Sequence, residues 1–527
     1  MRLAITILLL AVFGAAAPAE ASTGGTLRIL SAADDVDFDP ARSSSSAISL
    51  PSLVLRRLNT WDARPGKPTL VTPDLATDTG RSDDGGRTWT HTLKPGLKYA
   101  DGSPITSADI KFGVERTFAA KHSGGLGYHR SLLAGGADYR GPYDGEKLDS
   151  IETPDDRTIV FRLRMAYRDW PWIASMAAFV PVPESKDEAV ASGPYQIALK
   201  KRDKRAELIR NPHWDRASDP IRTAEPDRIV MELGQSAEEQ ARRLVADAGK
   251  DRYAIGTALL PTDTLKRIHQ SSELHKRLIT SAPDALEYLA MNTTRGPLAV
   301  RKVRQAMQYA IDKRPLMQAY GEYTTVEYAS ALIGPGMPGR VDYQLYAKDP
   351  SGDVATARRL LAEAGHADLK LTLSYDDEIR WREEAETIAR GLARAGIAVT
   401  LKPIVDPAED FELRVSAWLA DYPNPAASIH PLFTSRGSDH NITGYADPEV
   451  DAAMDRAFAE ADPVRAQAQW ASLDRRIMRD APVVPLLYSG ISTMHGSRVE
   501  NLTATANPHF LNYLRLSLRS DTQSSSH

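Results

Sequence analysis

The chain has 527 residues, enough for about three or four domains of ordinary size, so it is not a single small module. Its 65 Lys and Arg residues against 69 Asp and Glu residues leave a net charge of −4, which gives no electrostatic footprint for nucleic acid or for an anionic membrane surface. Cysteine is absent, which excludes disulfides, thiolate metal sites, cysteine nucleophiles and a lipid anchor on an N-terminal cysteine.

The N-terminus has the pattern of a signal peptide. A positive charge precedes an apolar run over 3–13, and an alanine-rich stretch follows that contains Ala19 and Ala21. This pattern predicts a signal peptide over residues 1–21, cleaved before Ser22. A transmembrane anchor is the alternative, but a span needs about 20 apolar residues and this run is shorter. We therefore expect a mature protein outside the cytoplasm, without a lipid anchor.

The first half of the mature chain is rich in short strands. A leucine- and isoleucine-containing segment after Gly24 predicts a buried strand, and residues 86–105 have the punctuation of antiparallel hairpins. Thr106 and Asp109 have the spacing of a capping box, so we expect a helix to start there. Residues 156–163 predict another strand.

The second half alternates helices with strands. The charged patch at 200–205 predicts the solvated tip of a hairpin, and residues 300–311 place an apolar stripe on one helical face. Residues 354–401 read as helix, strand, helix and strand in close succession, which predicts a parallel sheet with right-handed crossovers. Further helices should start at Asp447-Pro448 and Asp462-Pro463, each with an acidic N-cap. Val483–Tyr488 predicts a last strand of an α/β fold.

Motifs that would indicate an enzyme are missing. The chain contains no G-x-S-x-G, H-E-x-x-H or P-loop sequence, and its twelve histidines form no i, i+4 pair. Gly334–Gly339 matches G-x-G-x-x-G formally, but two prolines interrupt it and no helix follows, so we interpret it as a rigid loop. We expect no catalytic residues, no metal and no cofactor.

One segment combines an acid with aromatic rings. Trp418, Asp421 and Tyr422 lie at the end of a predicted strand, just before a proline-broken loop. A carboxylate between aromatic faces suits a ligand ammonium, through charge-assisted hydrogen bonds and cation–π attraction. A strand end with a core tryptophan and a turn-capping aspartate is an equal alternative on chemistry alone.

Several motifs in order along the mature chain carry a family resemblance. They are Gly24–Ile29, Asp39-Pro40, Pro73–Ala76, Asp83–Thr106, Gly193–Tyr195, Met291–Thr293, Val303–Ala306, Ala310–Asp312 and Trp418–Pro425. The chain resembles the substrate-binding proteins of peptide-type ABC importers, the family of oligopeptide-, dipeptide- and nickel-binding proteins. The stretch from Lys94 to Asp109 is the most diagnostic part.

The resemblance implies an α/β, two-lobed periplasmic-binding-protein fold, type II-like, with an additional subdomain in the N-terminal lobe. The chain should cross between the lobes near Ala282 and again near Pro485. The implied limits are a core of lobe I at 22–62, 191–282 and 486–527, an extra subdomain at 63–190, and lobe II at 283–485.

The resemblance also implies a site and a function. Asp421 matches the position that holds the ligand's ammonium, with Trp418 and Tyr422 beside it, and Ser416 and Ala417 in the preceding strand would offer backbone groups to an extended ligand. We therefore expect a monomeric extracytoplasmic protein that captures a small peptide or amino-acid-like cation by hinge closure and delivers it to a membrane ABC permease. A binder of nickel, haem or oligosaccharide, or a secreted enzyme on the same scaffold, stays an alternative.

Overall fold

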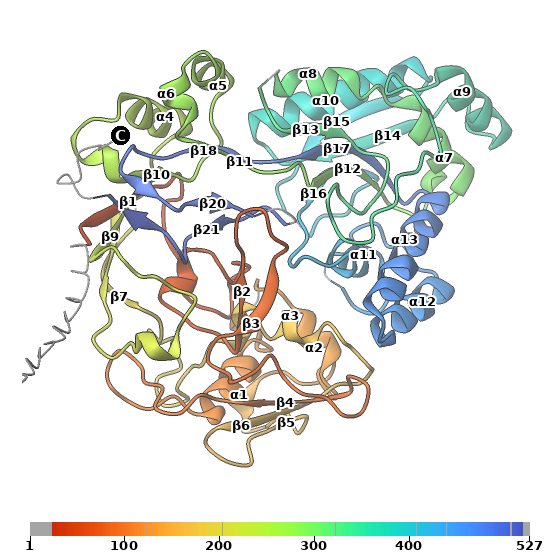
Figure 1. The fold of residues 1–527 in the computed structure, drawn as a ribbon. Helices are drawn as coiled ribbons and strands as arrows, with labels where there is room; N and C mark the ends of the chain where they lie inside the picture. The colour runs from red at the N-terminus through yellow and green to blue at the C-terminus, as the bar shows by residue number, and fades with distance from the viewer. Residues whose placement is uncertain are drawn as a thin grey trace, which may run out of the picture.

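A computed structural model describes residues 24–122, 124–202, 204–321, 323–406, 408–438, 440–505 and 508–519. The predicted signal peptide and its cleavage site lie outside these ranges. No helix within them is long and apolar enough to cross a membrane. Figure 1 shows two lobes joined by a narrow pair of strands, with an extra subdomain below the first lobe.

Lobe I is built on a five-stranded sheet in the order β10-β1-β9-β8-β7. Its elements are β1 (Thr26–Leu30), β7 (Tyr195–Lys201), β8 (Arg205–Arg210), β9 (Arg228–Glu232), β10 (Ala254–Gly256), α4 (Ala237–Ala246), α5 (Thr262–His269) and α6 (Ser272–His275). β1 runs parallel to β9 and β10, and its Leu27, Ile29 and Leu30 are buried. β7 and β8 form the hairpin that the charged patch predicts.

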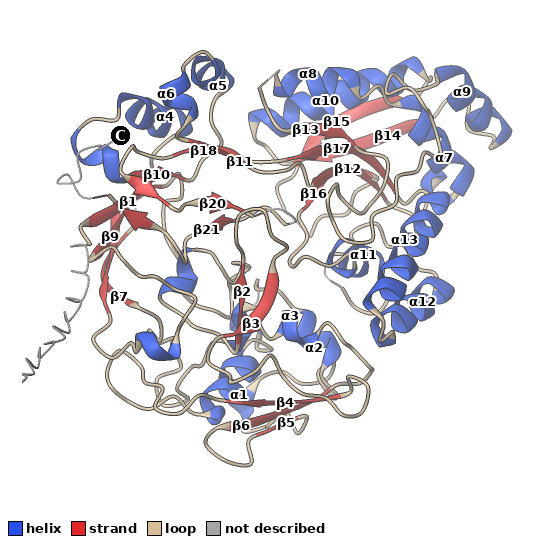
Figure 2. Ribbon diagram, viewed as in Figure 1, coloured by secondary structure: helices blue, strands red, loops and turns tan. Residues whose placement is uncertain are grey.

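The extra subdomain consists of short elements and long loops (Figure 2). Its elements are β2 (Asn59–Asp62), β3 (Leu70–Pro73), β4 (Thr88–Thr92), β5 (Ile151–Glu152), β6 (Thr158–Arg162), α1 (Ser107–Arg116), α2 (Tyr128–Leu132) and α3 (Trp170–Ile173). The capping box is confirmed, since the Thr106 amide donates to Asp109 over 2.7 Å at the start of α1. β6 pairs with β4 and β5, as the alternation in that segment predicts.

Lobe II contains a six-stranded sheet in the order β13-β17-β12-β16-β14-β15. Its strands are β12 (Ala285–Met291), β13 (Val326–Tyr328), β14 (Lys370–Tyr375), β15 (Ala398–Pro403), β16 (Leu413–Trp418) and β17 (Val483–Ser489). Its helices are α7 (Arg301–Ala310), α8 (Arg314–Tyr320), α9 (Val354–Glu363), α10 (Ile379–Arg394), α11 (Ala426–Phe433), α12 (Pro448–Ala459) and α13 (Pro463–Asp480). α9, β14, α10 and β15 follow one another, with β14 and β15 parallel, as predicted.

The helices of lobe II cover both faces of this sheet. In Figure 1, α8 and α10 lie above the sheet, whereas α11, α12 and α13 lie below it, next to the extra subdomain. The predicted caps are present, because Asp447 accepts from the amide of Glu449, and Asp462 accepts from the amide of Val464. The segment Gly334–Gly339 forms turns and opens no helix.

Two neighbouring strands connect the lobes. β11 (Leu278–Thr280) leads into β12, and β17 leads into β18 (Ser492–Met494), with β11 and β18 paired antiparallel. The first crossing therefore lies between Thr280 and Ala285, near the expected Ala282. The second crossing follows Ser489, a few residues beyond the expected Pro485, because β17 continues as a fully buried strand through that proline.

The C-terminal segment returns to lobe I. It forms two small antiparallel pairs, composed of β19 (Val499–Glu500), β20 (Thr503–Ala504), β21 (Leu511–Asn512) and β22 (Ser517–Leu518). The Tyr513 amide donates to the Ile48 carbonyl over 3.0 Å, and the Thr223 amide donates to the Leu514 carbonyl over 2.9 Å. The last residues of the described chain thus complete the lobe that its first residues began.

Candidate ligand-binding site

The strand that precedes the predicted acid has a free edge. β16 pairs with β12 along its whole length, from Leu413 to Trp418. On its other side β14 pairs only with Leu413 and Arg414. The backbone from Val415 onward therefore has no strand beside it on that edge, within the described residues, and an extended ligand can add there.

The side chains of this strand alternate between two faces. Ser416 and Trp418 lie opposite Tyr288 and Leu286 of β12, whereas Ala417 lies opposite Glu287. Because directly paired residues share a face and neighbours alternate, Ser416 and Trp418 point to one side of the sheet and Ala417 to the other. Ala417 therefore has only its backbone to offer to a ligand that lies beside Trp418.

Trp418 is held in one orientation and is only partly buried. Its indole Nε1 donates to the Ala427 carbonyl over 2.8 Å, and the ring of His440 lies 5.0 Å from it. The tryptophan also packs against the main hydrophobic core. Trp418 thus packs against the core on one side and is partly exposed on the other, and its contact with a ligand stays a prediction.

Asp421 lies where the two lobes meet. The Tyr128 hydroxyl, on α2 of the extra subdomain, donates to Asp421 Oδ2 over 2.6 Å. Burial raises the pKa of Asp421 to about 7, and the Tyr128 hydrogen bond only partly opposes this increase. Among the described residues, no cation forms an ion pair with this carboxylate. The site therefore holds an acid without a counter-charge, which is the arrangement that an incoming ammonium group would complete.

Tyr422 is fully enclosed by other side chains. Its side chain has an exposed fraction of 0%, and its hydroxyl shares a hydrogen bond of 3.0 Å with the Tyr167 hydroxyl. The Trp172 ring stacks on it with centroids 6.2 Å apart, and the Tyr128 ring meets it edge-on at 5.9 Å. Tyr422 thus packs among the aromatic residues around Asp421, and its contact with a ligand stays a prediction.

The extra subdomain supplies residues that sequence reasoning missed. Besides Tyr128, Asp169 accepts a hydrogen bond from the Asn424 side chain over 3.2 Å, and burial raises the pKa of Asp169 to about 7. The Arg168 amide donates to the Phe458 carbonyl over 3.2 Å, and the Tyr167 ring stacks on the Phe458 ring at 4.2 Å. Nothing in the sequence around these residues marks them as partners of a segment that lies far along the chain.

A cavity of about 470 Å³ begins at Tyr128 and continues between the extra subdomain and lobe II. We call it the arginine-lined cavity. The charged side chains among its described lining residues are Arg130, Arg140, Arg164, Arg436 and one acid, Asp138. His430 also lines it, and burial lowers the pKa of this histidine to about 4, which leaves it neutral. The cavity is therefore suited to a negatively charged group.

The described residues contain no cluster of three or more His, Asp or Glu side chains that could hold a metal ion. The chemistry that this site offers is one of binding, with an acid, an aromatic ring, a free strand edge and a basic cavity side by side.

Residues 71–440 match the sequence profile of the bacterial extracellular solute-binding proteins, family 5 (middle region). The chain belongs to this family. Members of the family are binding proteins that act outside the cytoplasm. This agrees with the two-lobed fold and with a site built between the lobes.

Three known proteins illustrate the similarity. The periplasmic murein peptide-binding protein MppA of Escherichia coli (strain K12) is 23% identical over 487 residues, which cover 86% of each chain. The structure titled clavulanic acid biosynthesis oligopeptide binding protein 2 is 33% identical, with a TM-score of 0.86 over 94% of this chain and 96% of that one. The structure of DppA from Helicobacter pylori in complex with peptide STSA is 19% identical, with a TM-score of 0.75 over 94% and 99%. This last similarity concerns the fold alone.

Proposed function

We propose that this solute-binding protein captures a small peptide or an amino-acid-like ligand with a free ammonium group, and delivers it to a membrane ABC permease. The observation that carries the proposal is Asp421, a carboxylate at the lobe interface with a hydroxyl partner but no paired cation among the described residues. Relatives named for binding peptides, such as MppA, support a peptide as the ligand class.

Each part of such a ligand has a counterpart in the site. The ammonium group would bind Asp421, with the aromatic face of Trp418 beside it. The ligand backbone would run along the free edge of β16 after Arg414. A carboxylate would be attracted to the arginine-lined cavity, whose volume of about 470 Å³ is in the usual range for small-molecule sites.

Hinge closure would couple binding to transport. The hydrogen bonds between Tyr128 and Asp421, and between Asn424 and Asp169, join the extra subdomain to lobe II. These contacts require the lobes to be close together. A ligand that contacts both sides adds to them and shifts the population toward the closed form, which the permease would then recognise.

We expect no catalytic activity, because the members of this family are binding proteins. The absence of cysteine leaves no thiol for a lipid anchor, which supports a protein that is free outside the cytoplasm. We also propose that the protein is a monomer and that its partner is a membrane ABC permease.

The test begins with the ligand and then removes the charge of Asp421. Native mass spectrometry of the exported protein identifies the co-purified ligand, and calorimetry measures its affinity for the wild type and for Asp421→Asn. We expect the variant to fold but to bind at least about 2 kcal/mol more weakly, roughly 30-fold, because the ammonium loses its charge partner.

The exposed Asp410, which pairs with Arg295 on the surface of lobe II, provides a matched control. Asp410→Asn should bind like the wild type. Unchanged affinity in Asp421→Asn would remove the acid from the site, and a ligand without an ammonium group would contradict the proposed ligand class.

A further inference from the structure

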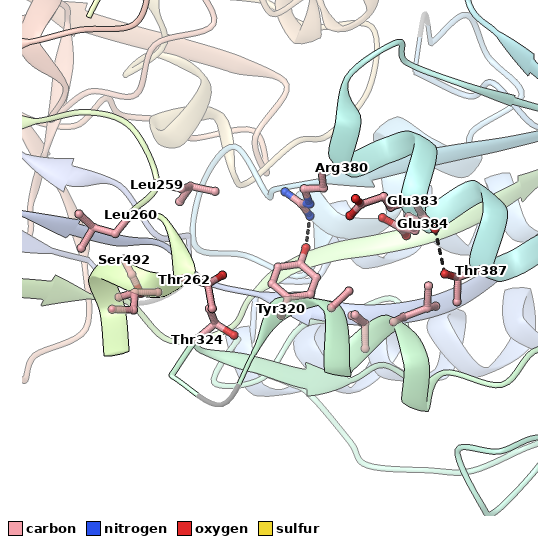
Figure 3. A pocket seen from close by; sticks show the side chains of 15 residues that line it. Leu259, Leu260, Thr262, Tyr320, Thr324, Arg380, Glu383, Glu384, Thr387 and Ser492 are labelled. Atoms are coloured by element: carbon pink, nitrogen blue, oxygen red, sulfur yellow. Dashed lines mark hydrogen bonds between the residues drawn. The ribbon is translucent and has the colours of Figure 1, made fainter. Parts of the chain in front are cut away.

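A second cavity lies across the hinge, and we call it the hinge cavity. Its volume is about 210 Å³. Leu259, Leu260 and Leu265 of lobe I form one wall, and Leu316 of α8 and Glu384 of α10, both in lobe II, lie on the other. Figure 3 shows Leu259 and Leu260 on one side of this space and α10 on the opposite side, with Arg380 and Glu384.

The hinge cavity is separate from the site around Asp421. Leu487 of β17 lines it, whereas the next residue, Tyr488, packs into the other core, on the side of Tyr422. Because neighbouring side chains of a strand point to opposite faces, the two sites lie on opposite faces of the lobe II sheet. A molecule in the hinge cavity would therefore not occupy the space next to Trp418.

One buried carboxylate, Glu384, lines this cavity, and a second, Glu287, lies behind the lining residues Tyr320 and Arg380. Glu287 of β12 has an exposed fraction of 1%, and its Oε1 accepts hydrogen bonds from Tyr320, Arg380 and Ser489. Its Oε2 is buried without a partner. Glu384 has an exposed fraction of 7%, and its Oε1 is also buried without a partner. Unsatisfied buried oxygens of this kind are rare in native proteins and point to a missing donor.

The single arginine in the described lining is already engaged. Arg380 forms an ion pair with Glu287, and its guanidinium lies 4.9 Å from the Tyr320 ring and 4.6 Å from the Trp381 ring. No Lys, Arg or His within the described ranges lies within ion-pair distance of Glu384. Burial and the charge of Glu287 together raise the pKa of Glu384 to about 8. A cation bound from solution would offset the cost of the buried negative charge on Glu384 and its repulsion by Glu287.

We propose that the hinge cavity binds a small organic ammonium ion with an apolar body, whose ammonium group donates to Glu384 and whose body contacts the leucines of both lobes. The apolar part of the lining consists of five leucines and one alanine, and three threonines and Ser492 also line the cavity. The volume of about 210 Å³ exceeds the engineered cavity of about 150 Å³ that holds benzene. The hinge cavity therefore has room for one aromatic ring that carries a short aminoalkyl chain.

The test uses phenethylammonium as the probe. Binding to the full-length protein is followed by calorimetry and by ligand-observed NMR at mildly alkaline pH, where Glu384 is ionised. 2-Phenylethanol and 3-phenylpropionate have nearly the same shape but are neutral and anionic. We expect saturable binding of the ammonium compound, and at least tenfold weaker binding of the other two.

Two variants separate the role of the charge from that of the space. Glu384→Gln should weaken phenethylammonium at least tenfold, whereas Glu386→Gln, exposed on the same helix but outside the lining of the cavity, should not. Leu260→Trp leaves the carboxylate in place but fills the cavity, and should also abolish binding. Circular dichroism and retained binding of the peptide-type ligand show that each variant is folded.

Asp421→Asn distinguishes this proposal from the proposed function. That variant should lose the peptide-type ligand and keep phenethylammonium. If Asp421→Asn weakens the probe as much as Glu384→Gln does, the probe binds the other site and the proposal is wrong. Absence of saturable binding, or equal binding by Glu384→Gln and the wild type, would also overturn it.

Discussion

Asp421 exchanges its proton close to neutral pH, because burial raises its pKa to about 7. Its folded-state pKa lies above the ordinary value of 3.8, so the unliganded protein gains stability from this group at low pH and loses it as the pH rises through about 7. An ammonium ligand reverses this preference, since it binds the ionised carboxylate. Ligand binding below neutral pH must therefore release a proton.

This linkage predicts a pH-dependent affinity. If only the ionised form of Asp421 binds the ammonium group, affinity should increase roughly 30-fold between about pH 5.5 and pH 8 and then level off. Calorimetry in buffers of different ionisation enthalpy measures both the affinity and the proton release. Asp421→Asn should abolish the dependence.

Asp169 provides the control, because burial raises its pKa to about 7 as well. Asp169 accepts a hydrogen bond from Asn424 and forms none with Asp421 within the described residues, so Asp169→Asn should keep the dependence. A pH profile that disappears in Asp169→Asn and persists in Asp421→Asn would show that Asp169, and not Asp421, releases the proton.

At this scale the sequence pointed to one part of the candidate site. The segment with Trp418 and Asp421 resembles a family motif, and the role of both residues in ligand binding stays a prediction. Tyr128 could not be found in this way, since it lies 293 residues from the acid to which it donates. Tyr422 is predicted in the site because it neighbours the acid, and the structure shows its ring against Trp172 and its hydroxyl bonded to Tyr167.

Among the elements, those with strong local signals were predicted most reliably. The helices α12 and α13 begin where an aspartate precedes a proline, because the aspartate accepts backbone hydrogen bonds and the proline needs no donor. The proline inside β17, in contrast, does not end that strand. Pro485 lies at a bulge of β17, and β13 pairs only with Leu487 to Ser489, so the missing amide leaves no partner unsatisfied on that edge.

The N-cap of α13 allows a local test. Asp462 accepts from the amides of Val464 and Arg465 over 2.9 and 3.2 Å. Asp462→Ala should weaken the first turn by about 1 kcal/mol and accelerate hydrogen exchange of these two amides roughly fivefold, whereas Asp462→Asn should change it little, since asparagine is also a good N-cap. Exchange followed by mass spectrometry measures the effect. Equal exchange in the two variants would mean that the ion pair with Arg465, and not the cap, stabilises this turn.

For the whole molecule, the paired crossings make lobe II an insertion within lobe I. Lobe II begins and ends in neighbouring strands, because Ala285 lies opposite Ser489 in the sheet. Lobe I, in contrast, is assembled from two distant stretches. Its core includes Leu502, Tyr513, Leu514 and Leu516 from the C-terminal segment. Local sequence patterns predict the elements of both lobes, but they do not show that the two ends of the chain share one core.

The insertion determines the order in which the protein can fold as it emerges from an export channel. Lobe II is complete once Ser489 has emerged, whereas lobe I is complete only after the last strands.

A chain that ends at Gly490 should therefore yield a protease-resistant fragment close to residues 283–489, while its lobe I is degraded. Limited proteolysis with mass spectrometry, compared with the full-length protein, measures this and tests the domain limits. A resistant lobe I in the shortened chain would show that it folds without its C-terminal segment.

In the full-length protein, we expect lobe II, which carries Asp421, to fold before lobe I, which carries Tyr128, is complete. The site between them should therefore be the last part of the molecule to form.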